Sequence, residues 1–102
     1  MSKEGDTVAD AITARLAAHK HLGRSAKQQL GWLKMGQFGQ RKLSELSMDT
    51  LTELADDMLS EDRLPQTVAG YLTILVNTLD WASRRKFIVP IASLRQAMDH
   101  MW

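Results

Sequence analysis

The side chains that most often carry out chemistry are few in this chain, and their spacing does not suit a catalytic site. His19 and His21 lie two positions apart, so on a helix they do not share a face, and His100 is remote in the sequence. No HExxH pattern is present, and the absence of cysteine excludes thiolate metal sites, disulfides and cysteine nucleophiles. Tyr71 falls within an apolar stripe, where core packing is its expected role. We therefore expect no catalytic residue, no metal site and no cofactor.

Length and composition indicate a small globular protein rather than a membrane or disordered one. The chain has 102 residues, of which 44% are hydrophobic and 25% charged, which suits one domain with one core. No apolar run approaches the ~20 residues that cross a membrane, and the polar N-terminus has no signal-peptide stretch. We expect a cytoplasmic location, which the lack of cysteine also fits.

The charges are segregated along the chain, although the formal net charge is only +1. Residues 11–44 contain no acidic residue and the basic residues Arg15, Lys20, Arg24, Lys27, Lys34, Arg41 and Lys42. Residues 45–62 contain no basic residue and the acidic residues Glu45, Asp49, Glu53, Asp56, Asp57, Glu61 and Asp62. Residues 63–95 are basic again. Two interpretations follow: a molecule with one basic face, or solvated helix faces whose counter-charges lie close in space.

Helices must position these side chains, because no strand or hairpin pattern appears. A first helix is expected to begin at Asp6 as its N-cap, with a thin apolar stripe formed by Ile12 and Leu16. A second is expected to begin at Ser25 and to end at the glycine-containing loop of residues 36–40.

The second half of the chain carries the strongest helical patterns. Ser47 is a suitable N-cap for an acidic helix, whose apolar stripe is Leu51, Leu54, Ala55, Met58 and Leu59. After a polar loop at 60–64, Pro65 fits the first position of a helix that extends to about residue 85. Its stripe is Val68, Tyr71, Leu72, Leu75, Val76, Leu79 and Ala82. With a short last helix after the connector 87–90, the expected fold is all-α, a compact bundle of four to five helices without a sheet.

Three segments, taken in order, resemble the core-binding domain of the tyrosine recombinase (phage integrase) family. They are LSELSMDTL at 43–51, LPQTVAGYL at 64–72 and LDWASRRKFI at 79–88. The second matches the family's proline, threonine, aliphatic and Tyr-Leu spacing at the start of its third helix. The third matches its aromatic-alanine pair, followed by basic and aliphatic residues before a proline. Leu64 stands where the family often has a capping serine, and Val89 stands where asparagine is usual.

The resemblance spans roughly residues 25–90 and implies a SAM-like helical domain that clamps double-stranded DNA beside a separate catalytic domain. The family's catalytic residues lie in that second domain and none can be matched here, so this chain is expected to be non-catalytic and part of a larger recombinase. Residues 1–23 would form an N-terminal helix and connector, and residues 24–102 the DNA-binding domain. The implied partners are DNA, the catalytic domain of the same parent chain and other recombinase protomers on the DNA.

Basic and polar side chains on the second and fourth predicted helices are the candidate DNA contacts. They are Arg24, Ser25, Lys27, Gln28, Lys34, Arg41, Lys42, Gln66, Thr67, Thr73, Arg84, Arg85 and Lys86. The acidic helix should face away from DNA or toward a basic partner surface.

Two alternatives stay open. One is a helical protein-interaction domain whose basic face binds an acidic protein. The other is a divergent helix-turn-helix regulator formed by residues 51–72, although its expected turn, 60–64, is longer than the usual three to four residues and lacks glycine.

Overall fold

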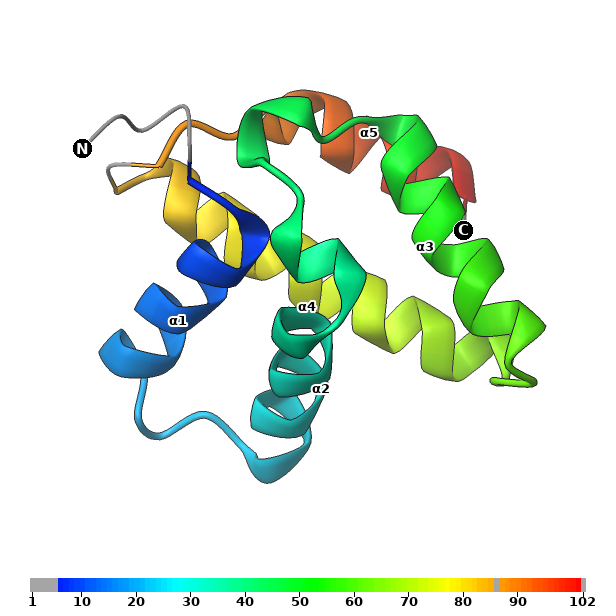
Figure 1. Ribbon diagram of the computed structural model, residues 1–102, viewed down its shortest axis with the longest axis horizontal. Helices are drawn as coiled ribbons and strands as arrows, with labels where there is room; N and C mark the ends of the chain where they lie inside the picture. Colours follow the sequence, from blue (N-terminus) through cyan, green and yellow to red (C-terminus); the bar gives the residue numbers. More distant parts are fainter. Residues whose placement is uncertain (1–5, 86, 102) are drawn as a thin grey trace.

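The structure is a computed structural model that describes residues 6–85 and 87–101. This part of the chain forms five α-helices: α1 (Val8–Ala18), α2 (Arg24–Met35), α3 (Met48–Ser60), α4 (Pro65–Ser83) and α5 (Ile91–Met101). Two short 3-10 helices, η2 (Gln37–Gln40) and η3 (Leu43–Glu45), connect α2 to α3 (Figure 1). The described residues contain no strand beyond one isolated bridge between Thr7 and Lys42. The predicted all-α bundle is therefore confirmed.

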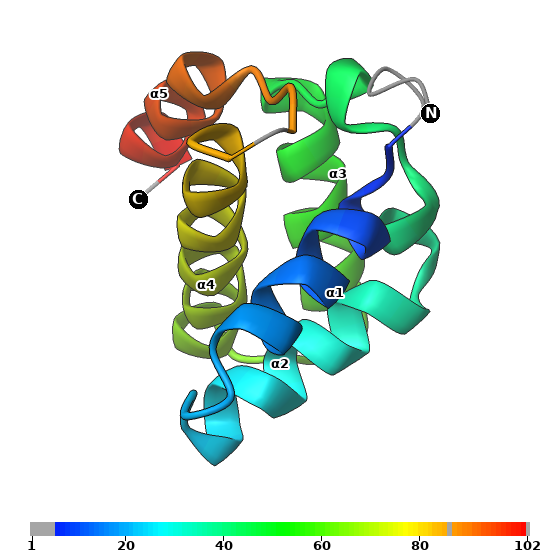
Figure 2. The same cartoon turned by 90° about the vertical axis from the view of Figure 1, so that its left-hand side faces the viewer.

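Helix α4 is the centre of the bundle, because α1, α2, α3 and α5 all pack against it (Figures 1 and 2). Its predicted apolar stripe is buried, apart from the half-buried Tyr71. Pro65 occupies its first turn, as expected. The apolar periodicity did not predict the burial of Thr78. This residue is fully buried, and its hydroxyl forms hydrogen bonds within the bundle. That hydroxyl donates to the Ile74 carbonyl at 2.8 Å and accepts from an Arg15 guanidinium nitrogen at 3.0 Å.

Helix α1 begins one residue later than predicted. Thr7, not Asp6, is its N-cap: the Thr7 N–H donates to Asp10 Oδ2 at 2.9 Å, and the Asp10 N–H donates to Thr7 Oγ1 at 3.3 Å. Val8 and Ile12 are fully buried against α2 and α4. In its packing, α1 shares one core with the other helices, while the functional division after residue 23 stays a prediction.

Helix α2 begins at Arg24 with Gly23 as its N-cap, so the expected cap at Ser25 is wrong; Ser25 lies in the first turn. The helix ends at Met35, directly before Gly36 and Gly39, where the sequence predicted a break. Gly39 is buried against the end of α2. A Cβ there would lie 2.8 Å from the Leu33 carbonyl oxygen and closer still to that of Lys34.

Helix α3 has the predicted N-cap, Ser47, whose N–H donates to Thr50 Oγ1 at 2.8 Å. Its stripe is buried except for Leu59, which is 40% exposed because it lies at the edge of the packed face. The turn to α4 is four residues long, 61–64, and so is shorter than expected. Asp62 adopts φ 65° there, and the N–H groups of Asp62 and Arg63 bond the Leu59 and Met58 carbonyls, which makes a Schellman motif with aspartate in the glycine position.

None of the described helices combines the length and apolar character that a membrane crossing requires.

Candidate nucleic-acid interface

Helices α2 and α4 meet at close range in the middle of the molecule. At Gly70 a Cβ would lie 3.6 Å from the Gln29 side-chain nitrogen. One turn further along α2, the Trp32 ring meets the ring of Tyr71, the residue after Gly70, edge to face with centroids 5.3 Å apart. The Arg63 guanidinium lies 4.6 Å from the Trp32 ring centroid and fastens the loop before α4 to the same contact. The position of α2 on α4 is therefore set by a glycine and an aromatic cluster.

Some of the predicted contacts on these two helices lie near that crossing. Ser25 lies one turn before Gln29 on α2, and Gln66 and Thr67 lie about one turn before Gly70 on α4, so these three residues share the helix faces of the contact. Gln28 is the sequence neighbour of Gln29 and lies on a different face, and Thr73 lines a pocket with Arg95, Met98 and Asp99 of α5. All five side chains are exposed, as are Arg24 and Lys27. Lys34, near the other end of α2, is half-buried. The fold thus brings together predicted residues from two separate parts of the chain.

The same two helices begin without a side-chain cap. Neither the Gly23 nor the Leu64 N-cap makes a side-chain hydrogen bond to its helix, whereas Thr7 and Ser47 take part in capping boxes on α1 and α3. The first-turn N–H groups of α2, and those of Gln66 and Thr67 in α4, have no capping side chain; Pro65, the first residue of α4, has no N–H. Free amides at a helix N-terminus favour anions such as phosphate.

A second basic cluster lies at the C-terminal end of α4. Arg84 and Arg85 are exposed there, and with Arg15 of α1 they line a pocket of about 400 Å³. Arg15 was not among the predicted contacts, because its proximity to residues 84 and 85 arises only from the packing of α1 on α4 (Figure 2). Lys86, the remaining predicted member, falls outside the described residues.

The electrostatic environment of Arg15 is unusual for an arginine. One of its terminal nitrogens donates to the Thr78 hydroxyl, its Nε is buried with no partner, and no carboxylate of the described residues lies within ion-pair distance. Burial lowers the pKa of Arg15, since a partly dry site disfavours the charged form.

Arg41 and Lys42 lie apart from the cations at the start of α2. Arg41 forms an ion pair with Glu53 at 2.7 Å, and its guanidinium lies 5.9 Å from the Phe38 ring centroid. Lys42 is exposed beside its bridge partner, Thr7. The structure does not bring these two residues together with Arg24 and Lys27.

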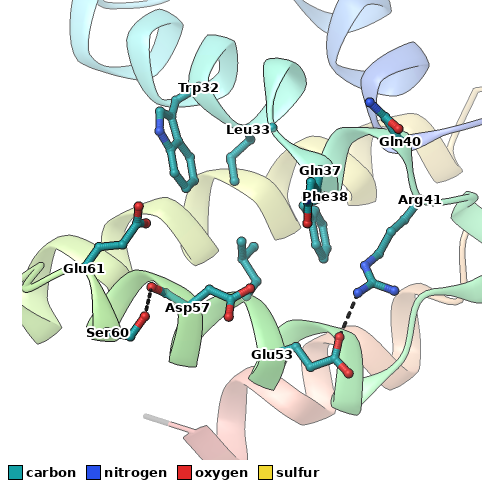
Figure 3. A pocket seen from close by; sticks show the side chains of 12 residues that line it. Trp32, Leu33, Gln37, Phe38, Gln40, Arg41, Glu53, Asp57, Ser60 and Glu61 are labelled. Atoms are coloured by element: carbon teal, nitrogen blue, oxygen red, sulfur yellow. Dashed lines mark hydrogen bonds and ion pairs between the residues drawn. The ribbon is translucent and has the colours of Figure 1, made fainter.

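Arg41 lines a groove of about 750 Å³ between α2, η2 and α3 (Figure 3). One side of this groove carries Trp32 and Phe38, and the other carries Glu53 and Asp57 of α3 and Glu61 at its C-cap (Figure 3). The acidic helix therefore presents its charge to a surface with aromatic walls.

The charged segments largely remain unpaired with one another in the part of the chain that the structure describes. Among the basic residues of 11–44 and the acidic residues of 45–62, Arg41–Glu53 is the one ion pair. The other ion pairs join Asp80 to Arg84 and to Arg95. This pattern favours a molecule with separate basic and acidic surfaces over one whose charged faces neutralise each other.

The residues described form no group of three histidine or acidic side chains that could hold a metal ion. The His19 ring instead contacts Trp81 edge to face, with centroids 5.5 Å apart. Histidine in this arrangement joins α1 to α4 through packing.

A scan against family models, a search of curated proteins and a search of solved structures each return no match to this chain. The segments that resemble tyrosine recombinases fall on η3 and the start of α3, on the first half of α4, and on the end of α4 with the connector after it.

Proposed function

We propose that this chain is a DNA-binding domain of the core-binding type, which clamps double-stranded DNA at a recombination site for a separate catalytic domain. The observation that carries the proposal is the crossing of α2 and α4. The two crossing helices carry exposed cations on α2 and exposed amide and hydroxyl side chains on both, and each helix begins without a side-chain cap. The resemblance in segments 43–51, 64–72 and 79–88 supplies the recombinase assignment.

The phosphate backbone supplies most of the binding free energy in this proposal. Arg24 and Lys27 neutralise phosphates and release condensed counterions, which gives affinity that does not depend on sequence. Gln66 and Thr67, in the first turn of α4, offer side chains that can bond base edges or phosphate oxygens. Modest sequence preference follows, because few side chains in this set can read bases.

The acidic helix α3 is assigned to the side away from DNA. Its carboxylates Glu53 and Asp57, with Glu61 at its C-cap, would repel phosphate, and all three line the groove of Figure 3. A basic surface of the catalytic domain or of another protomer is the partner that suits this charge.

A titration of the chain with duplexes of mixed sequence, at several salt concentrations, tests the proposal. Affinity should fall with salt at a log–log slope of about −0.9 for each phosphate neutralised. Replacing Arg24 and Lys27 by glutamine should reduce the magnitude of this log–log slope by about 1.8, because two phosphate contacts are lost.

The matched control removes two charges from the acidic helix α3. Glu53→Gln with Asp57→Asn should leave the affinity unchanged or slightly higher. No binding at low salt, or binding indifferent to the Arg24 and Lys27 replacements, would favour the protein-interaction alternative, in which the basic face binds an acidic protein.

A further inference from the structure

The pocket between α1 and the C-terminal end of α4 has an excess of positive charge that the described residues do not balance. Its lining includes three arginines, Arg15, Arg84 and Arg85, and one carboxylate, Asp80. Asp80 Oδ2 already lies 3.3 Å from Arg84 and 2.9 Å from Arg95, so it serves two cations at once. Neither Arg15 nor Arg85 has a carboxylate within ion-pair distance among the described residues.

Part of this charge is withdrawn from water. Arg15 Nε is buried without a hydrogen-bond partner, and so is the indole Nε1 of the neighbouring Trp81. The Arg85 guanidinium lies 5.3 Å from the Trp81 ring centroid, which holds that cation at the rim of the pocket. A partly buried cation without a counter-charge is unfavourable, and an anion in the pocket would offset the desolvation of Arg15.

The donors present suit an oxyanion with several oxygens. Each guanidinium offers a planar fork of N–H groups, and such forks bind phosphate with two parallel hydrogen bonds. A tetrahedral phosphate can receive donors from more than one direction, as it would from Arg15 on α1 and from Arg84 and Arg85 in the turn after α4. The pocket volume of about 400 Å³ leaves ample space for a phosphate group.

We infer that this pocket binds a phosphate oxyanion through Arg15, Arg84 and Arg85. The identity of this oxyanion rests on the proposed function: if that function holds, the oxyanion is a backbone phosphate of the bound duplex. Arg84 lies 14 residues beyond Gly70, which corresponds to about 21 Å along α4. The pocket would therefore be a second anchor, up to about six base-pair steps from the α2–α4 crossing.

Titration of the chain with inorganic phosphate, followed through the indole N–H signals in ¹⁵N–¹H spectra, tests the site directly. Trp81 lines the pocket and Trp32 lies at the α2–α4 crossing instead, so the two signals report on the two places separately. A Trp32→Phe variant assigns the signal from the crossing, and a Trp81→Phe variant assigns the signal from the pocket. Sodium chloride at equal ionic strength controls for screening. We expect the Trp81 signal to shift saturably with phosphate, with a binding curve that does not depend on any shift of the Trp32 signal.

Three variants tie the signal to the arginines. Arg85→Gln changes an exposed side chain without an ion pair, and Arg15→Gln keeps a donor for Thr78, so both should fold as the parent does in circular dichroism. Each should weaken phosphate binding about tenfold, as the loss of a charged hydrogen bond does. Lys20→Gln, which removes an exposed cation outside the pocket lining, should leave the affinity unchanged.

The outcomes separate this site from the proposed function. No Trp81 shift beyond that caused by chloride, or equal affinity in Arg85→Gln and the parent, overturns the phosphate site even if DNA binds at the crossing. A phosphate response without any binding of duplex DNA at low salt supports the site and contradicts the DNA function. If duplex DNA binds without moving the Trp81 signal, the backbone phosphate is excluded as its ligand.

Discussion

Gly39 shows how one residue without a side chain decides the path of the chain after α2. It is buried in η2, directly against the last carbonyls of α2, and a Cβ there would contact the Lys34 and Leu33 backbone oxygens. The neighbouring atoms belong to the backbone, so they cannot turn aside as a side chain can. The pair Gly36 and Gly39 has the spacing of a nucleic-acid-clamping GxxG loop, but that motif requires a sheet. Close packing against α2 is the physical reason for Gly39 here.

Replacing Gly39 by alanine should therefore lower the free energy of unfolding by about 1–3 kcal/mol, the usual cost of overpacking. Gly31, in the middle of α2, is the matched control because a Cβ there meets nothing within 4 Å. Gly31→Ala should raise stability by up to about 1 kcal/mol through helix propensity. Urea denaturation of both variants measures this contrast, and equal changes in the two would contradict the packing of η2 on α2.

Asp62 provides a second test at the residue scale. Its φ of 65° lies in the left-handed region, where an L-residue is strained and glycine is not. Asp62→Gly should raise the unfolding free energy by up to about 1 kcal/mol, and Asp62→Val should lower it by about 1–2 kcal/mol. Thermal unfolding of the two variants, with opposite shifts in Tm, is the expected result. Shifts of the same sign would argue against a Schellman turn between α3 and α4.

At the scale of elements, α4 has to fill the core and also present a polar surface. Leu72 and Leu75 are fully buried, with 0% of their surface exposed. Thr67 and Thr73, on the same helix, are exposed. The two sets of side chains therefore serve different purposes.

Substitutions on α4 should separate stability from binding. Leu72→Ala and Leu75→Ala should each cost ~2–5 kcal/mol, because each leaves a cavity in the middle of the bundle. Thr67→Ala should change the unfolding free energy little and weaken DNA binding. Chemical denaturation and a DNA titration of the same variants provide both readings. A Leu75→Ala protein that unfolds like the parent would show that α4 is wrongly placed.

At the scale of the whole molecule, the five helices share one hydrophobic core. Val8 and Ile12 of α1 are fully buried in the core that α2, α4 and the rest share. The Val8 N–H also bonds the Arg41 carbonyl at 2.9 Å, which ties the start of α1 to the loop before α3.

Deleting residues 1–23 should therefore leave a chain that does not fold cooperatively, rather than a smaller stable domain. Circular dichroism and a thermal melt should show loss of the sigmoidal transition, because the apolar faces of α2 and α4 that α1 covers become exposed. The matched comparison is deletion of residues 1–5, which precede Thr7 and its capping box and should leave the melting transition in place. A well-folded 24–102 fragment would instead support a structural boundary after residue 23.

Much of the architecture could be predicted from the sequence, because its causes are local. The 3.6-residue stripe of α4, Pro65 in its first turn and Ser47 before α3 depend on neighbours within a few positions along the chain. Local signals also had limits. They placed the cap of the first helix one residue early, at Asp6 instead of Thr7. They placed the cap of the second helix two residues late, at Ser25 instead of Gly23. In both cases a neighbouring residue can fill the same role.

The candidate sites required the tertiary structure. Arg15 and Thr78 are hydrogen-bonded although 63 positions separate them, and nothing in the spacing of either residue indicates the other. Likewise, the sequence placed Arg41 among the basic contacts, and the packing of η2 beside α3 gave it Glu53 as a partner. The sequence by itself determined which faces of the helices are apolar and where the charges lie along the chain. The packing of α1 and α2 on α4 decided which charges meet, because contacts between distant residues depend on how whole helices bury their faces together.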